Sequence, residues 1–294
     1  MTQTNPFSNG SRRKLLQNRS FGNGWVRSVF LLLVLGSARA GEPLDVPLPG
    51  DDATYRTTVL VRKGSALGTG TIIASVEGET LILTASHVVE EPGPLHVEFF
   101  RYNLGYERSR SVTGFPRRIS ASIAARDRNT DLAILRVGGQ LKFPYVARIA
   151  PSDRPIPGGT FVTSIGFDRG ERLIGFATKV KRVERIDMDR GGGDRSFLIT
   201  ENPPEMGRSG GGLFLQDGTL VGVCLARAQI KPGAVLGMYG TVGNVERLLK
   251  TQKTLASVVA RSQPVVPAPP APATATRRPE TPEINRTGDR IRAN

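Results

Sequence analysis

Gly207-Arg208-Ser209-Gly210-Gly211-Gly212-Leu213 sets one serine among four glycines and leads into the apolar run Leu213-Phe214-Leu215. Glycine is favoured where the main chain turns tightly or approaches a ligand closely. A serine in such a loop can carry its hydroxyl next to backbone N–H groups, which is the arrangement that an oxyanion requires. A flexible glycine turn between two strands fits this stretch equally well, so the rest of the chain has to decide.

Two histidines precede this serine. His87 follows the strand-like run 81–84, and taken singly it is an ordinary residue at a strand end. His96 lies in a second strand-like run without a glycine loop or an acidic partner nearby, and we interpret it as an ordinary strand residue. Asp131 stands directly before the apolar residues 132–135, where it is either a turn residue or an acid held at the rim of a barrel.

The chain order of these residues separates three hydrolase classes. The nucleophile elbow of α/β-hydrolases needs its histidine after the serine, and no histidine follows Ser209. In the subtilisin order, Asp comes before His and His before Ser, and Asp51 or Asp52 could serve as the acid. That fold is α/β, however, and the strand pattern of this chain argues against it. His87, Asp131 and Ser209 follow one another in the order of chymotrypsin-like barrels.

Most of the chain between residues 55 and 243 is a series of short β-branched or apolar runs separated by Gly, Pro, Asp and Asn. A hairpin signal, Asp217-Gly218, joins two of them. No helical pattern alternates with the runs, which favours an all-β, barrel-like fold. One helix is expected near the end, with Asn244 as its N-cap, with Val245, Leu248 and Leu249 on one face, and with Leu255 and Val259 as candidates to continue that face. The predicted strands are 57–61, 71–76, 80–84, 95–100, 131–137, 160–166, 172–183, 196–200, 213–216 and 220–226.

Four segments together resemble a trypsin-like serine endopeptidase, in particular the bacterial HtrA/Deg branch. They are Gly68-Thr69-Gly70-Thr71-Ile72-Ile73, residues 84–89 around His87, Thr130-Asp131-Leu132-Ala133, and the glycine loop around Ser209. The resemblance covers about residues 55–250. It implies two six-stranded antiparallel β-barrels, with His87 and Asp131 from the first barrel and Ser209 from the second. The residues after Lys250 are too few and too rich in proline for a PDZ domain.

The chain departs from this family pattern at three places. Gly212 stands where proline is usual, which we expect to loosen the turn after the serine. Arg208 replaces the usual Asn or Asp, and we expect a solvent-facing side chain. In digestive relatives an Asp there pairs with a newly cut N-terminal amine, so activation by such a cut is not expected. Gly166-Phe167-Asp168 replaces the common Gly-Asn/Tyr-Pro.

The resemblance implies a triad in which His87 is the base, Asp131 orients it and Ser209 is the nucleophile. The backbone N–H groups of Gly207 and Ser209 would bind the oxyanion. In relatives that cut after basic residues, an acid at the base of the substrate pocket selects them, and by this resemblance no acid stands at that position here. A preference for small or medium apolar residues before the cut is therefore expected. The alternative is a catalytically silent, protease-like binding module. The predicted substrate pocket comprises Pro203, Met206, Gly222, Leu225 and Ala226.

Composition limits the other classes. The net charge is +14, but residues 1–40 hold six bases and no acid, and residues 251–294 contribute +4. The basic excess therefore lies largely in the ends, and we expect protein or peptide substrates rather than nucleic acid. Two histidines and one cysteine show no metal-ligand spacing, so neither metal nor cofactor is expected. Cys224 cannot form an intramolecular disulfide, and we expect a buried, inert thiol.

The two ends of the chain suggest export. Residues 1–40 resemble a signal peptide cleaved after Ala40, or an uncleaved membrane anchor, and residues 41–54 form a leader segment. Arg12-Arg13 also allows the twin-arginine route. A periplasmic or secreted location is therefore expected. Residues 251–294 are interpreted as the end of the helix and a disordered Pro- and Ala-rich tail, and the oligomeric state stays open.

Overall fold

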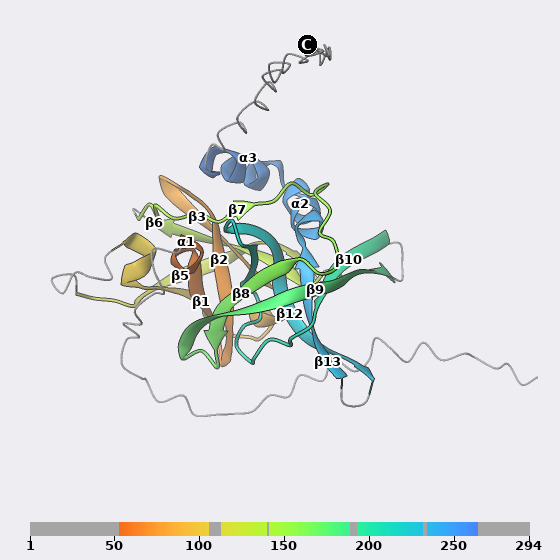
Figure 1. The fold of residues 1–294 in the computed structure, drawn as a ribbon. Coiled ribbons are helices and arrows are strands. Elements are labelled where there is room, and N and C mark those ends of the chain that lie inside the picture. The colour runs from red at the N-terminus through yellow and green to blue at the C-terminus, as the bar shows by residue number, and fades with distance from the viewer. Residues whose placement is uncertain (1–52, 106–112, 140, 189–192, 232–233, 264–294) are drawn as a thin grey trace, which may run out of the picture. The chain divides into compact units, whose positions relative to one another are not determined.

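The computed structural model describes residues 53–105, 113–139, 141–188, 193–231 and 234–263 (Figure 1). The predicted signal peptide, the leader up to residue 52 and the Pro- and Ala-rich tail lie outside the described residues. Strands dominate the described part, which confirms the all-β prediction. A short helix, α1 (Ala53–Arg56), precedes the first strand.

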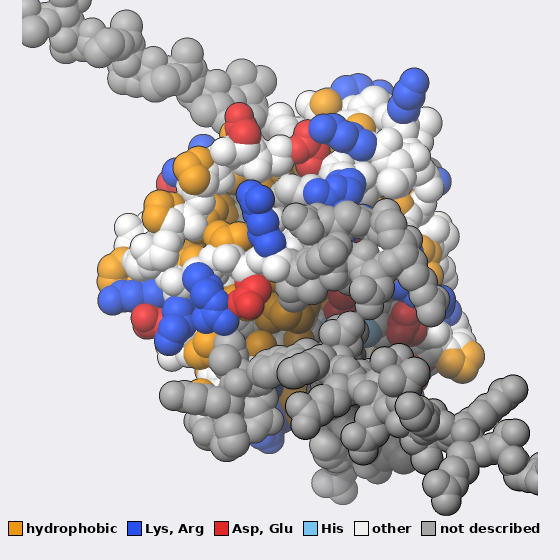
Figure 2. All heavy atoms as spheres, turned by 90° about the vertical axis from the view of Figure 1, so that its right-hand side faces the viewer, with side chains coloured by type: hydrophobic (Ala, Val, Ile, Leu, Met, Phe, Trp, Pro, Cys, Tyr) orange, Lys and Arg blue, Asp and Glu red, His pale blue; other side chains and the backbone are white. Residues whose placement is uncertain are grey.

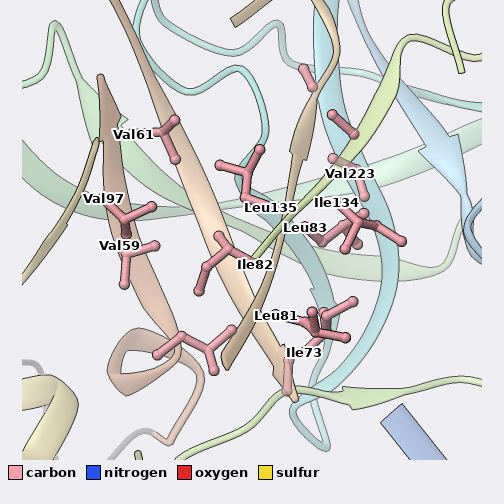
Figure 3. Packing of buried hydrophobic residues seen from close by; sticks show 14 of the residues in the cluster. Val59, Val61, Ile73, Leu81, Ile82, Leu83, Val97, Ile134, Leu135 and Val223 are labelled. Carbon is pink, nitrogen blue, oxygen red and sulfur yellow. The ribbon is translucent and has the colours of Figure 1, made fainter. Parts of the chain in front are cut away.

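The first six strands form a closed antiparallel barrel in the order β1-β2-β3-β6-β5-β4. A methyl group at Gly70 on β2 would meet the side chains of Val59, Val61 and Ile82, so glycine is needed where these residues fill the interior. Figure 3 shows the three side chains among the buried cluster. Burial of this cluster as a whole removes apolar surface from water, which is the dominant favourable contribution to folding. The strands are β1 (Thr58–Lys63), β2 (Ala66–Val76), β3 (Gly78–Ala85), β4 (Leu95–Phe99), β5 (Arg117–Asp127) and β6 (Leu132–Gly139).

The second barrel is built from the later strands in the order β11-β8-β9-β10-β13-β12, and it closes because β11 also pairs with β12. The short strand β7 adds to β12 in parallel. Gly218, with φ +76°, supports the turn between β11 and β12, as the Asp-Gly signal predicts. The strands are β7 (Arg148–Ile149), β8 (Phe161–Asp168), β9 (Arg172–Met188), β10 (Gly193–Thr200), β11 (Gly212–Leu215), β12 (Thr219–Lys231) and β13 (Ala234–Thr241).

Two turns between strands of the first barrel contain short 3₁₀ helices. The first, η1 (His87–Val89), follows β3 directly. The second, η2 (Arg101–Leu104), follows β4 and is held by Asn103, whose side chain accepts a hydrogen bond from the Phe100 N–H at 2.7 Å. Asn103 also donates to the carbonyl oxygens of Arg56 and Thr58. This buried amide therefore fixes η2 against the start of β1.

The C-terminal region contains two helices rather than one. The first, α2 (Val242–Lys250), begins after Thr241, so the prediction of Asn244 as N-cap is wrong. Asn244 is buried in the first turns and donates its side-chain amide to the carbonyl of Ser196 at 2.8 Å. The second helix, α3 (Lys253–Ser262), packs on β2, where Ser262 accepts a hydrogen bond from the Ser75 N–H at 2.7 Å. Figure 1 shows the two helices in succession at the C-terminal end of the described chain.

Charged side chains are mixed on the face drawn in Figure 2, where Lys and Arg lie among Asp, Glu and uncharged residues. Several arginines pair with acids: Arg126 and Arg128 lie 3.5 and 3.4 Å from the same oxygen of Glu90. Among the described helices, none combines the length and the apolar content that crossing a membrane requires.

Candidate active site

His87 and Asp131 meet at one end of the first barrel. The antiparallel pairing of β3 with β6 places Ala85 opposite Leu132, so the residues just after β3 and just before β6 become neighbours. His87 Nδ1 lies 2.7 Å from Asp131 Oδ2, and the His87 N–H donates to Asp131 Oδ1 at 2.9 Å. Both oxygens of one carboxylate therefore hold the histidine, one through its ring and one through its backbone.

The backbone of Asp131 is held in an unusual conformation. Its φ is +55°, in the left-handed region that residues other than glycine rarely adopt. The carbonyl of Asp131 accepts the Ser86 N–H at 2.9 Å, which compensates part of this strain. The preceding turn is closed by Asp127, whose Oδ1 accepts the Asn129 N–H at 2.9 Å. The turn thus aims the Asp131 carboxylate back at His87.

The glycine loop of the second barrel is attached to β2 of the first. The Thr69 N–H donates to the Ser209 carbonyl at 2.7 Å, and Thr69 Oγ1 donates to the Gly207 carbonyl at 2.9 Å. A methyl group on Gly68 would meet Val88 and the Ser209 carbonyl, so glycine permits this close approach. The two barrels therefore bring the three predicted catalytic residues to one region.

The Ser209 hydroxyl is hydrogen-bonded to the carbonyl of Leu225 at 3.5 Å. Within the described residues no hydrogen bond joins this hydroxyl to His87, and His87 Nε2 has no hydrogen-bond partner. The His87 side chain keeps 30% of its surface exposed. The structure therefore shows one contact of the predicted triad formed and the other open.

In the backbone around Ser209, the carbonyl groups are hydrogen-bonded while, among the described residues, two of the N–H groups are not. The carbonyl oxygens of residues 206–209 all accept hydrogen bonds, from the Arg169 N–H, Thr69 Oγ1, the Gly211 N–H and the Thr69 N–H respectively. The N–H groups of Gly207 and Ser209 donate none within the described part of the chain. The carbonyls are thus turned into the protein, and the two predicted oxyanion donors remain available.

Gly210 lies where the glycine loop packs closely against the first barrel. Its φ is +88°, and a methyl group would overlap the Thr69 carbonyl and the Thr84 hydroxyl. We expect Gly210→Ala to lower the free energy of unfolding by more than about 2 kcal/mol, measured by urea unfolding. Gly114→Ala is the matched control, because Gly114 has φ +80° and nothing within 4 Å of the added methyl. Equal losses for both variants would contradict a close fit at Gly210.

Arg208 differs from the sequence prediction. Its side chain is 1% exposed rather than solvent-facing, and its guanidinium makes two contacts with the Asp168 carboxylate, at 2.5 and 3.0 Å. Asp168 belongs to the Gly166-Phe167-Asp168 segment, so two departures from the family pattern contact each other. A signal was present in the sequence, since each departure introduces a charge of opposite sign, but their separation of 40 residues conceals the pairing.

Gly212 also differs from the expectation of a loosened turn. It opens β11 and is paired with Val223 on β12 and with Ile165 on β8. It is buried, and a methyl group there would overlap the Phe214 ring. The residue is therefore fixed in a sheet on both sides, and glycine serves the close packing of Phe214.

The residues of the predicted substrate pocket occupy different surroundings. Leu225 is buried, and its carbonyl contacts the Ser209 hydroxyl. Ala226 is half-buried beside it and pairs with Met238. Met206 is 51% exposed next to Gly207. Gly222 lies nearer the start of β12, where an added methyl would meet Leu198 and the Gly240 carbonyl. Pro203 is half-buried in the loop before Met206.

Cys224 is buried, as predicted, and burial raises the pKa of its thiol to about 12. Because the thiolate is the reactive form, we expect iodoacetamide to leave native Cys224 unmodified at pH 8. Complete alkylation in urea, followed by mass spectrometry, is the internal control. Since the thiol ionises more readily when unfolded, its contribution to stability is complete below pH 9 and is lost as the pH rises toward 12. Rapid alkylation of the native protein would contradict the burial.

Residues 68–223 match the trypsin-like peptidase domain, which is more than half of the chain. The matched stretch contains His87, Asp131 and Ser209. The chain therefore belongs to the trypsin-like peptidase domain family.

A relative with a Do-like name agrees with the resemblance to the HtrA/Deg branch. The chain is 25% identical over 202 residues to the putative protease Do-like 14 of Arabidopsis thaliana, which is 68% of this chain and 44% of that protein. The chain thus spans less than half the length of this relative.

Solved structures share the fold. The Rv3671c protease of M. tuberculosis in its active form matches with a TM-score of 0.54 at 22% identity, over 73% of this chain and 85% of that one. The inactive form of Rv3671c protease gives 0.53 at 23% identity, over 68% and 90%. The MamO protease domain of Magnetospirillum magneticum gives 0.52 at 20% identity, over 66% and 96%. These matches confirm the predicted two-barrel architecture.

Proposed function

We propose that the chain is a serine endopeptidase that hydrolyses peptide bonds through His87, Asp131 and Ser209. The observation that carries the proposal is the state of the imidazole: Nδ1 is held by Asp131 at 2.7 Å, and Nε2 is left without a described partner. A histidine held in this way keeps the proton on Nδ1 and offers Nε2 as a base. Protein or peptide substrates follow from this function.

In the proposed first step, Nε2 of His87 removes the proton from Ser209 as its oxygen attacks the carbonyl carbon of the scissile peptide. The proton then passes to the leaving amine, and an acyl-enzyme ester remains on Ser209. Water repeats the sequence and releases the acid. Asp131 stabilises the imidazolium that forms in each half of the reaction, without itself accepting the proton.

The amides of Gly207 and Ser209 are the proposed donors to the oxyanion. Both are free among the described residues, while their neighbouring carbonyls are hydrogen-bonded elsewhere. Fixed donors of this kind need no reorganisation when charge develops on the carbonyl oxygen, and the loss of one typically costs about 2.7–4 kcal/mol of transition-state stabilisation.

The hydroxyl of Ser209 has to leave Leu225 for His87 when substrate binds. At 3.5 Å the bond to the Leu225 carbonyl is at the weak limit of hydrogen-bond geometry, so breaking this bond requires little free energy. Catalytic hydrogen bonds are commonly long or open in unliganded enzymes and tighten with substrate. The open contact is therefore compatible with a resting protease.

The same open contact favours a second candidate, a protease-like binding module without catalysis. A fluorophosphonate probe distinguishes the two, because its phosphorus bonds to the activated serine oxygen as fluoride leaves. Labelling located on Ser209 by mass spectrometry supports the enzyme. Absence of labelling across pH 6–9, with trypsin labelled in parallel, would support the binding module.

For the residue before the cut we propose a preference for small or medium apolar side chains. Met206 stands three residues before Ser209, and Ala226 follows Leu225, whose carbonyl contacts the Ser209 hydroxyl. Both are apolar, and Pro203 brings no charge to the predicted pocket. We expect a peptide library read by mass spectrometry to be cleaved mainly after Ala, Val, Leu or Met. Cleavage chiefly after Lys or Arg would overturn this preference while leaving the proposed chemistry intact.

Export is proposed from residues 1–40 alone, with the enzyme acting on envelope proteins in the periplasm or outside the cell. N-terminal sequencing of the mature chain tests the cleavage site, since a start at Gly41 is expected. A mature chain that begins at its first residues would leave the alternative of a membrane anchor.

A further inference from the structure

The Arg208 side chain is buried in the second barrel with all parts of its guanidinium engaged. Nε and one terminal nitrogen face the two Asp168 oxygens at 2.5 and 3.0 Å. The other terminal nitrogen donates to the carbonyls of Ser164 and Ile174 at 3.0 and 2.9 Å. The guanidinium also lies 4.7 Å from the centre of the Phe176 ring. Four hydrogen bonds from a rigid plane thereby hold the guanidinium in one orientation.

A buried ion pair is weak evidence for stability, even though Asp168 keeps 21% of its side-chain surface exposed. Removing two charges from water offsets much of their mutual attraction, and well-packed apolar residues are often as stable or more stable. What distinguishes Arg208 is its position, because it is the residue between Gly207 and Ser209. Its backbone is the link between the two free amides.

The segment around Asp168 holds the loop at three consecutive residues. The Arg169 N–H donates to the Met206 carbonyl at 2.7 Å. The Phe167 N–H donates to Thr69 Oγ1 at 2.9 Å, and Thr69 Oγ1 in turn donates to the Gly207 carbonyl. The Asp168 carboxylate completes the set by holding the Arg208 side chain.

We propose that the Arg208–Asp168 ion pair is a positioning element that keeps the amides of Gly207 and Ser209 aimed at the oxyanion. This inference rests on the proposed proteolytic function. Because Arg208 is a cation, a newly cut N-terminal amine cannot pair with it, and the charge partner is supplied from within the folded chain. The loop is thus set for catalysis without a cleavage at the N-terminus.

The test replaces both charges by apolar side chains of similar size, in the double variant Arg208→Met/Asp168→Leu. We expect a midpoint of thermal unfolding equal to or above that of the parent. We also expect the maximal rate of fluorophosphonate labelling to fall about 100-fold, with the half-saturating probe concentration changed less than about threefold. A loss confined to the maximal rate indicates misaligned donors rather than a damaged binding site.

A matched control removes a different ion pair, in Arg136→Met/Glu79→Leu. Arg136 Nε and Glu79 Oε1 lie 2.6 Å apart, and Glu79 is at the start of β3, the end of the strand opposite His87. This control is expected to keep the parental labelling rate. Its failure to do so would mean that loss of any ion pair impairs the enzyme, which would overturn the specific role of Arg208.

The conservative variant Arg208→Lys keeps the inference testable if the double variant does not fold. Lysine keeps the charge but cannot reproduce the planar fork or both carbonyl bonds. We expect a maximal labelling rate about tenfold lower at unchanged half-saturation. A parental rate in this variant, or in a folded double variant, overturns the inference. If the parent itself is never labelled, it is the proposed function that fails.

Discussion

Replacing Ser209 with alanine is expected to lower kcat/KM for a peptide substrate by roughly 10⁴–10⁶-fold. The variant loses the oxygen that forms the acyl-enzyme, and the remaining amides can contribute only residual catalysis. The measurement is the rate of cleavage of the best library peptide, followed over days by mass spectrometry. The thermal midpoint is expected to change little, because Ser209 donates only one long hydrogen bond, to Leu225.

Ser257→Ala is a suitable control for this experiment. Ser257 lies exposed on α3 and donates to the Thr254 carbonyl within the same helix. The Ser257→Ala variant should retain the parental rate, which would show that the preparation of a serine variant does not by itself reduce activity. Peptide cleavage by Ser209→Ala at the parental rate, with a clean sample, would rule out the proposed nucleophile.

Asp131→Asn is expected to lower kcat by about 10⁴-fold at neutral pH. An asparagine can still accept the His87 N–H through its carbonyl, but its amide group then faces Nδ1 as a donor. The ring would then accept a hydrogen bond at Nδ1 and carry its own proton on Nε2. Nε2 could therefore not act as the base. KM should remain close to the parental value, because in the proposed mechanism Asp131 acts through His87 and not on the substrate.

Asp217→Asn controls for the loss of one carboxylate. Asp217 lies in the turn between β11 and β12, at the opposite end of β11 from the glycine loop, and contacts Arg148 at 3.0 Å. Its replacement is expected to leave kcat unchanged. If Asp131→Asn kept most of its activity as well, another group would have to orient His87, and the proposed role of Asp131 would be wrong.

Sequence patterns predicted most of the described strands, including the partly exposed β9, and missed β5, β7 and β13. β5 was not predicted because its side chains are mostly polar or small and several are exposed. β13 was missed because its glycines interrupt the apolar run, although pairing with β10 and β12 fixes it. The second C-terminal helix was merged with the first because the break at residues 251–252 carries neither Gly nor Pro.

The site was predictable where function depends on local motifs and less so where it depends on distant pairing. His87 and Asp131 could be singled out because each is attached to a strand end, and antiparallel pairing then brings them together. The burial of Arg208 could not be derived from its own neighbours, since an arginine in a glycine turn is normally solvated. Only the fold brings Asp168 within reach and compensates the charge.

Thr69 gives the arrangement a mechanical consequence. One residue of the first barrel holds two carbonyls of the second barrel's loop, and its own carbonyl accepts the Thr84 hydroxyl at 2.7 Å, close to where His87 follows β3. A shift of one barrel relative to the other would therefore disturb the positions of both His87 and Ser209. Fragments ending between the barrels would each be inert alone, and recovery of turnover after mixing them would report their reassociation directly.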